Sequence, residues 1–474
     1  MKPEHGSVLD ILGIGFGPAN IALAIALEER GSWNSVRFLE RRSGPTWHPD
    51  MLLDGADIQN NPLRDFVTPR NPRSHYTFVN YLHSQGRLFD YLNLGLAFPL
   101  RKDYARYIEW VARQFDAVVE YDTEVASIGL GGAPSAYGGR CYEVRTKNGA
   151  RHLARSLVVG IGRSPNIPDV FRSVLGPRVF HFTEYLARIR HGTTNGRCPY
   201  RRICVVGGSQ SSVEIVLDLM TRYPDCEVVN VMRNYGYRLK DTSPFSEHVY
   251  FPEFVDYFFD ASPASKARLW EELKYTNYSS ADADVIHGLY LKLYEQKLDG
   301  RENVRMMPNR TVERVSSGQD GIAIEVREVH TGAVDVMTFD AVVLATGFRN
   351  FGSGESREGY PLLLEGVVDR LRLTSADVLH IGRDYDLEGR DGADEIPPIY
   401  LNGLCESSHG FGDAGSFSLL SVRSETIARS LARRLNGNGS ALSRRRDSPA
   451  FARKGDAIGD AYGSRSDTRP VAGG

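Results

Sequence analysis

A glycine-rich turn near the N-terminus has the residue types and spacing that bind the pyrophosphate of a dinucleotide. The turn reads GFGPAN, follows an apolar run and opens a helical pattern. Glycines at such a junction permit a tight turn and let backbone N–H groups approach the phosphates. The expected contacts are Gly15, Gly17, Pro18 and Asn20, with Asn20 in place of the usual third glycine. Glu40 ends the next apolar run, where a carboxylate accepts hydrogen bonds from a ribose with free hydroxyls, as in FAD or NAD.

A second turn of the same kind lies in the segment RICVVGGSQSSVE. Its expected contacts with a second dinucleotide are Gly207, Ser209, Gln210 and Ser211. Arg233 follows the next apolar run, at the position where the first unit has a carboxylate. A guanidinium there can pair with a 2'-phosphate, so this unit is expected to prefer NADPH over NADH.

The elements that must position these turns are strands and helices in alternation. Apolar runs such as VLDILGIG, RRICVVGG and FDAVVLATG are separated by helical patterns, which predicts an α/β fold with parallel sheets. We therefore expect two Rossmann-like dinucleotide-binding domains, with a smaller, largely helical substrate region. FDAVVLATG ends in Thr346 and Gly347, and a strand of this kind returns to the nucleotide in many two-dinucleotide flavoproteins, which favours FAD for the first unit.

The expected domain order follows from these positions. Residues 1–190 are predicted to form the first part of the FAD domain. Residues 191–335 are predicted to form the NADPH domain, with a substrate-region insertion at about 236–300. Residues 336–435 would complete the FAD domain and the substrate site. Residues 436–474 are poor in large apolar side chains and are predicted to be a disordered tail.

Composition excludes several classes of function. The 474 residues carry a formal net charge of -2, so no general attraction to nucleic acid or to anionic membranes is expected. The five cysteines include no C-x-x-C pair, which removes the dithiol of flavin disulfide reductases and predicts no metal site. The N-terminus has no signal-peptide pattern, and no apolar run is long enough to span a membrane, so a cytoplasmic enzyme is expected.

Two further segments carry a family resemblance. They are TWHPDMLLDGADIQNNPLRDFVTPRNPRSHYTFVNYLH and KYTNYSSADADVI. Together with GFGPAN, GGSQS and ATGF, they closely resemble the microbial N-hydroxylating flavoprotein monooxygenases, the ornithine and lysine N-hydroxylase family. The resemblance extends from about Val8 to Leu435, with the motifs in the family's order.

The resemblance implies a class B flavoprotein monooxygenase that uses FAD, NADPH and O2. In that family NADPH reduces FAD, oxygen adds to the flavin as a C4a-hydroperoxide, and an unprotonated amine attacks the distal oxygen to give a hydroxylamine. The protein supplies a water-poor pocket and the geometry. Related enzymes are commonly homodimers or homotetramers, so a homo-oligomer is expected.

The resemblance also assigns residues. Gln59 falls on the catalytic glutamine beside the flavin C4a edge, and Asn277 falls on the asparagine that touches NADP+ and the reactive edge, with Tyr278 next to it. Trp47, His48 and Met51 fall on the family's W-H-x-x-M segment along the FAD. Core packing is the alternative for Trp47 and Met51.

The substrate positions depart from the family pattern. Members acting on ornithine hold its carboxylate with a lysine and an asparagine, and Arg64 and Glu247 stand at these positions. The C-terminal block is also longer and richer in glycine, and it contains Ser418 and Arg423. With Lys240, the arginines supply positive charge that suits an acidic amino acid such as L-aspartate, hydroxylated at its α-amine.

Three alternatives stay open at this point. A zwitterionic L-ornithine or L-lysine, hydroxylated for siderophore biosynthesis, would place its carboxylate on Arg64 and an ammonium on Glu247. A diamine would use Glu247 but leave Arg64 without a partner. In the third alternative Arg64 and Glu247 pair with each other as a structural salt bridge, and other groups bind the substrate.

Overall fold

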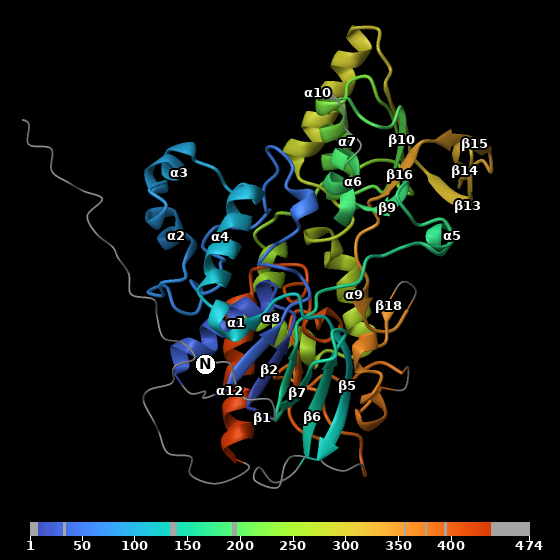
Figure 1. Ribbon diagram of the computed structural model, residues 1–474. Coiled ribbons are helices and arrows are strands. Elements are labelled where there is room, and N and C mark those ends of the chain that lie inside the picture. The colour runs from blue at the N-terminus through green and yellow to red at the C-terminus, as the bar shows by residue number, and fades with distance from the viewer. Residues whose placement is uncertain are drawn as a thin grey trace, which may run out of the picture.

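The computed structural model describes residues 8–31, 35–132, 140–191, 197–354, 357–374, 377–392 and 396–437. Two parallel five-stranded sheets form its two main bodies, one in the lower and one in the upper half of Figure 1. This arrangement confirms the expected α/β class with two Rossmann-like units. Of the expected tail, residues 438–474 lie outside the described part of the chain, and residues 436–437 end a helix.

The first sheet has the strand order β19-β8-β2-β3-β4, with every pair parallel. All four residues of β2 are buried, as expected for a central parallel strand covered on both faces. α1 (Pro18–Arg30) follows β2, and the C-terminal α12 (Leu420–Gly437) packs along it (Figure 1). The strands are β2 (Ile11–Ile14), β3 (Val36–Leu39), β4 (Val119–Glu120), β8 (Leu157–Val159) and β19 (Ile399–Leu401).

The second sheet has the order β12-β11-β10-β16-β9 and is also parallel throughout. α7 (Gln210–Arg222) follows β10. The buried apolar residues of this unit form two clusters, one on each face of the sheet. The strands are β9 (Val179–His181), β10 (Arg202–Val206), β11 (Glu227–Val231), β12 (Val304–Met307) and β16 (Ala341–Leu344).

The strand before the ATG motif corrects one expectation. β16 pairs with β10 and β9, so it belongs to the second sheet and not to the first sheet, where the FAD unit was expected. β9 lies in the second sheet too, although it falls within residues 1–190. The chain returns to the first sheet only at β19. An apolar run specifies a buried strand but not its neighbour, because strand order is set by contacts distant in sequence.

Three smaller sheets complete the β-structure of the described residues. The order β1-β7-β6-β5 describes one small sheet, and β13-β14-β15 forms an antiparallel sheet at the outer edge of the second unit (Figure 1). These strands are β1 (Val8–Leu9), β5 (Val125–Gly132), β6 (Arg140–Thr146), β7 (Arg151–Ala154), β13 (Arg310–Gly318), β14 (Gly321–Glu328) and β15 (Val334–Phe339), and the short β17 (Asn350–Phe351) pairs with β18 (Arg357–Glu358).

The remaining helices lie between the strands, whereas most of the remaining candidate residues, such as Gln59, Arg64 and Asn277, lie in turns and loops. Within the described residues, none of the helices is both long and apolar enough to cross a bilayer. The helices are α2 (Phe78–Ser84), α3 (Leu88–Leu94), α4 (Arg101–Arg113), α5 (Asp169–Arg172), α6 (Tyr185–His191), α8 (Pro252–Asp260), α9 (Pro263–Leu273), α10 (Ala283–Leu298) and α11 (Glu406–His409).

Candidate active site

The first glycine turn has the geometry of a pyrophosphate site. Gly15 has a φ of 82°, and a Cβ there would lie 2.6 Å from the carbonyl oxygen of Gly160, so only glycine fits. Gly17 is the N-cap of α1, which has neither a side-chain cap nor an acidic residue in its first turn. Its free N–H groups and positive dipole end therefore favour an anion. Glu40 accepts a hydrogen bond from the Phe16 N–H at 2.7 Å and keeps lone pairs for ribose hydroxyls.

Asn20 holds this turn from the inside. It is fully buried, its Nδ2 donates to the carbonyl oxygen of Gly15 at 2.7 Å, and its Oδ1 accepts from Asn402 at 3.0 Å. The side chain of Asn20 therefore positions the turn, and a contact of Asn20 with the cofactor stays a prediction. In the second unit Asn230 does the same, because its Nδ2 donates to the carbonyl oxygen of Gly207 at 3.0 Å. The sequence analysis identified neither Asn402 nor Asn230.

The second glycine turn matches the first. Gly207 has a φ of 152°, and a Cβ there would lie 2.3 Å from the carbonyl oxygen of Ala345. Ser209 is the N-cap of α7, again without a side-chain cap or an acidic residue in the first turn. Arg233 is exposed just beyond β11, and no carboxylate of the described residues pairs with it. Its guanidinium is thus available for a phosphate.

Thr346 and Gly347 lie where the two units meet. The Thr346 hydroxyl donates to the carbonyl oxygen of Asn166 at 2.5 Å, and the Asn166 N–H donates to the carbonyl oxygen of Gly347 at 2.9 Å. His181 Nε2 donates to the same carbonyl at 2.8 Å. Burial lowers the pKa of His181 to about 4, so this imidazole is neutral near pH 7. The hydrogen bonds that hold Thr346 and Gly347 at the junction are therefore uncharged.

The W-H-x-x-M segment divides between two environments. Trp47 is half-buried, with its ring edge-on to Phe417 at 5.5 Å between centroids. Burial lowers the pKa of His48 to about 4, and nearby arginines add to the effect. Met51 is 3% exposed and packs in the core of the second unit, as the packing alternative describes.

Gln59 is held at both its backbone and its side chain. Its φ is 53°, a left-handed conformation uncommon for a residue other than glycine. Its backbone N–H donates to Asp57 Oδ1 at 2.9 Å, and its side-chain Nε2 donates to the carboxylate of Asp282. Burial raises the pKa of Asp57 to about 6. Neither carboxylate was singled out by the sequence analysis.

Asn277 and Tyr278 lie beside a buried polar network. The Tyr278 hydroxyl accepts from Arg163 Nη1 at 2.9 Å and donates to the carboxylate of Glu406. Asn350 Nδ2 donates to the second oxygen of that carboxylate at 2.7 Å. Burial raises the pKa of Glu406. The buried Nδ2 of Asn277, by contrast, has no partner among the described residues.

Sequence analysis did not find Arg163, Asn350 or Glu406. Their only local signals are weak: Arg163 follows the end of a parallel strand, and Glu406 directly precedes the S-S-H-G block. Gly415 packs on the same network, since a Cβ there would lie 2.5 Å from the Tyr278 hydroxyl and 2.6 Å from Asn277 Nδ2. The longer C-terminal block therefore reaches the Asn277 side chain.

Arg64 and Glu247 come together as the third alternative anticipated. Their nearest N and O atoms are 3.8 Å apart, and the side chains are 29% and 31% exposed. The Arg64 guanidinium also lies over the Tyr250 ring, 5.7 Å from its centroid. A partly exposed ion pair of this length contributes about 0–1 kcal/mol, so a ligand with matching charges can replace it.

The other expected substrate contacts have protein partners. Lys240 Nζ lies 3.8 Å from Asp282 Oδ1, and the Ser418 hydroxyl donates to Asn60 Oδ1 at 3.2 Å. Arg423 is 1% exposed, its Nη1 pairs with Asp413 Oδ1 at 2.8 Å, and its Nε donates to Asn402 Oδ1 at 2.8 Å. The expected role of Arg423 in substrate binding is therefore corrected: a buried guanidinium with these partners is a structural group.

The donor set fits the two expected cofactors. Two helix N-termini are free of caps and acids, both glycine turns lack room for a Cβ, and the buried Asn277 amide has no partner. These features suit two pyrophosphates and a polar group at the junction between the units. Gly15, Gly17 and Glu40 would hold FAD, while Gly207, Ser209 and Arg233 would hold NADPH.

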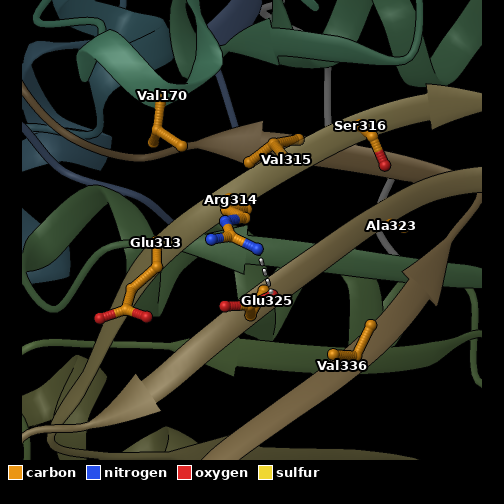
Figure 2. Close-up of a pocket in the computed structure, with 8 residues that line it drawn as sticks. All are labelled: Val170, Glu313, Arg314, Val315, Ser316, Ala323, Glu325 and Val336. Carbon is orange, nitrogen blue, oxygen red and sulfur yellow. Dashed lines mark ion pairs between the residues drawn. The ribbon is translucent and has the colours of Figure 1, made fainter.

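A pocket of about 410 Å³ lies elsewhere, on the β13–β15 sheet (Figure 2). None of the candidate residues lines it, and an ion pair of 3.9 Å between Arg314 and Glu325 crosses it. Its position separates it from both glycine turns. The candidate active site is therefore the junction of the two units.

Comparison with known proteins agrees with this geometry. Residues 7–350 match the family described as L-lysine 6-monooxygenase/L-ornithine 5-monooxygenase. An L-ornithine N(5)-monooxygenase of Burkholderia cepacia is 36% identical over 440 residues, which cover 90% of this chain and 95% of the relative.

Solved structures give the same result. The ornithine N-hydroxylase of Kutzneria sp. 744, with reduced FAD, NADP+ and L-ornithine, superposes with a TM-score of 0.81 and 31% identity, covering 90% of this chain and 100% of that one. The L-lysine 6-monooxygenase of Pseudomonas syringae superposes with a TM-score of 0.77 and 35% identity, covering 90% of this chain and 99% of that one.

Proposed function

The chain belongs to the L-lysine 6-monooxygenase/L-ornithine 5-monooxygenase family, and from that premise we propose that it hydroxylates the terminal side-chain amine of L-ornithine or L-lysine. It is an FAD- and NADPH-dependent N-monooxygenase. The choice of an amino acid over a plain diamine is supported most directly by the Arg64–Glu247 pair, which offers one charge of each sign within 3.8 Å. The choice of a basic side chain is supported by the similar proteins, which are named for ornithine and lysine.

The head group of an amino acid matches that pair. An α-carboxylate can take the place of Glu247 on Arg64, and an α-ammonium can take the place of Arg64 on Glu247. Arginine binds a carboxylate through two parallel N–H groups, which fixes the direction of the bound molecule. The distal amine would then extend away from this pair, toward Gln59 and Asn277.

The L-aspartate hypothesis loses its physical basis. It required a surplus of positive charge near the substrate, supplied by Lys240 and Arg423 in addition to Arg64. Arg423 is buried against Asp413, and Lys240 lies beside Asp282. The similar proteins reported above are named for ornithine and lysine, and both names fit a substrate with a distal amine.

The cofactors supply the redox chemistry, and the protein supplies orientation. When bound, FAD reduced by NADPH activates O2 for transfer of one oxygen atom to the amine. Arg64 and Glu247 would hold the head group. The buried amide of Asn277 offers an N–H donor at the junction, and Tyr278, Glu406 and Arg163 keep the segment that carries it in place.

A hydroxylamine assay tests the proposal. The FAD-loaded protein is given NADPH, O2 and, in separate reactions, L-ornithine, L-lysine, L-aspartate, putrescine or cadaverine. Ornithine or lysine should give hydroxylamine in proportion to NADPH consumed, and Arg64→Ala should raise the KM for that amino acid by about tenfold or more. The matching diamine without an α-carboxylate is putrescine for ornithine and cadaverine for lysine. Turnover of that diamine equal to turnover of the amino acid, or preferential turnover of aspartate, would contradict the proposal.

A further inference from the structure

Asp282 occupies a capping position but does not cap its helix. It is the N-cap residue of α10, with extended backbone angles, yet its side chain accepts no hydrogen bond from the first turn. Aspartate at an N-cap ordinarily accepts from the N–H two or three residues later. Here the carboxylate accepts from Gln59 Nε2 instead, with Lys240 Nζ 3.8 Å from its other oxygen. The Asp282 carboxylate therefore binds Gln59 and does not cap α10.

Gln59 itself is held against its backbone preference. Its φ of 53° is compensated by the 2.9 Å hydrogen bond from its N–H to Asp57, and its side chain is fixed by Asp282. Strained backbone at a residue whose neighbours fix it in this way is typical of functional sites. Two unfavourable local features, the missing helix cap at Asp282 and the left-handed backbone at Gln59, therefore accompany one fixed orientation of the Gln59 side chain.

The same aspartate connects Gln59 with the second dinucleotide unit. Its backbone N–H donates to Gln210 Oε1 at 2.9 Å, and the Gln210 N–H donates to the carbonyl oxygen of Ser280 at 3.1 Å. Gln210 is the first residue of α7, whose N-terminus follows the second glycine turn. A chain of hydrogen bonds thus runs from Gln59 through Asp282 to the expected NADPH site.

We propose that Asp282 is a positioning residue that fixes which end of the Gln59 amide faces the bound cofactors and couples that orientation to the NADP+ site. A carboxylate only accepts hydrogen bonds, so Gln59 must turn its NH2 group toward Asp282 and present Oε1 to the junction. A carbonyl oxygen there suits an N–H donor of a bound cofactor. This inference rests on the proposed function for the role of Gln59.

Asp282→Asn is the variant that isolates this effect. An asparagine of the same shape can donate to Gln59 Oε1, so the Gln59 amide can turn round while the fold is kept. The expected result is a fall of about tenfold in hydroxylamine formed per NADPH consumed, with peroxide released in its place. The rate of flavin reduction at saturating NADPH and the melting temperature should stay near those of the wild-type protein.

Asp284→Asn is the matched control. Asp284 is exposed in the first turn of the same helix, so the substitution makes the same charge change without touching Gln59. Asp284→Asn should leave coupling unchanged. In a double-mutant cycle with Gln59→Leu, the Asp282→Asn effect should disappear, because both changes act through one hydrogen bond.

A binding measurement separates this inference from the proposed function. Calorimetry of NADP+ with the FAD-loaded protein should show weaker binding to Asp282→Asn than to Asp284→Asn, whichever amine is the substrate. If the wild-type protein hydroxylates no amine, the proposed function fails while this comparison still stands. Equal coupling and equal NADP+ affinity in the two variants, or additive effects of Asp282→Asn and Gln59→Leu, would overturn the inference.

Discussion

Arg423→Met should lower stability far more than it lowers substrate affinity. Arg423 and Asp413 are 1% and 2% exposed at their side chains and pair at 2.8 Å. The substitution leaves the carboxylate of Asp413 buried with no cation. Removing one partner of a buried ion pair costs about 3–5 kcal/mol, because the other charge is left uncompensated.

The effect should concentrate on the first dinucleotide unit. Arg423 Nε donates to Asn402 Oδ1 at 2.8 Å, and Asn402 Nδ2 in turn donates to Asn20 Oδ1 behind the Gly15 turn. A loss of 3–5 kcal/mol corresponds to a fall in melting temperature of roughly 6 °C or more, at about 2–4 °C per kcal/mol for a domain of 150–250 residues. FAD affinity should fall with it.

The assay is thermal and denaturant unfolding followed by flavin fluorescence, together with the KM for the amino acid. The double variant Arg423→Met with Asp413→Asn should recover much of the loss, since no buried charge is left and the amide can still accept from the Cys405 N–H, which now donates to Asp413 Oδ2. A variant as stable as the wild-type protein but with a KM raised tenfold would refute this reasoning and restore Arg423 to the substrate site.

Three more outcomes are expected. Arg233→Ser should reduce kcat/KM for NADPH by about tenfold and leave that for NADH unchanged in steady-state assays, because the exposed guanidinium has only a 2'-phosphate to pair with. Gly415→Ala should lower kcat with FAD still bound, since the new Cβ would meet the Tyr278 hydroxyl at 2.5 Å and Asn277 Nδ2 at 2.6 Å; an unchanged kcat would exclude that contact. The free energy of unfolding should rise with pH between about pH 4 and 6.5, because burial lowers the pKa to about 4 at His48, His181 and His409, so the unfolded chain binds more protons there. His409→Gln should reduce that slope in denaturant titrations at several pH values, and an unaltered slope would contradict the assignment.

The local features of the fold were predictable from sequence. Gly15 and Gly207 stand directly after apolar runs and before helical patterns, and the turns they form depend on backbone freedom within a few residues. The class of enzyme followed from the order of such short motifs. Burial of β2 and β10 also follows from their composition, because a run of apolar residues must be covered on both faces.

The partners of these features were decided by the tertiary structure. β16 pairs with β10 and β9, which are more than 100 residues away in sequence. The apolar run AVVL predicts a buried strand but does not specify these neighbours, so the pairing could not be predicted from the sequence. Side-chain roles changed for the same reason. Asn20 turned inward to Asn402, and Arg423 turned to Asp413.

The substrate site shows most clearly which properties follow from the sequence and which need the tertiary structure. Residue types alone allowed Arg64, Lys240 and Arg423 to be summed as one positive surface. Their charges act only where they lie unpaired and within reach of a ligand, since electrostatic energy depends on distance and burial. Folding pairs Arg423 with Asp413, places Lys240 beside Asp282 and leaves Arg64 partly exposed next to Glu247. The sequence by itself determined the cofactors and the reaction class, while the choice of partner for each charge needed the folded chain.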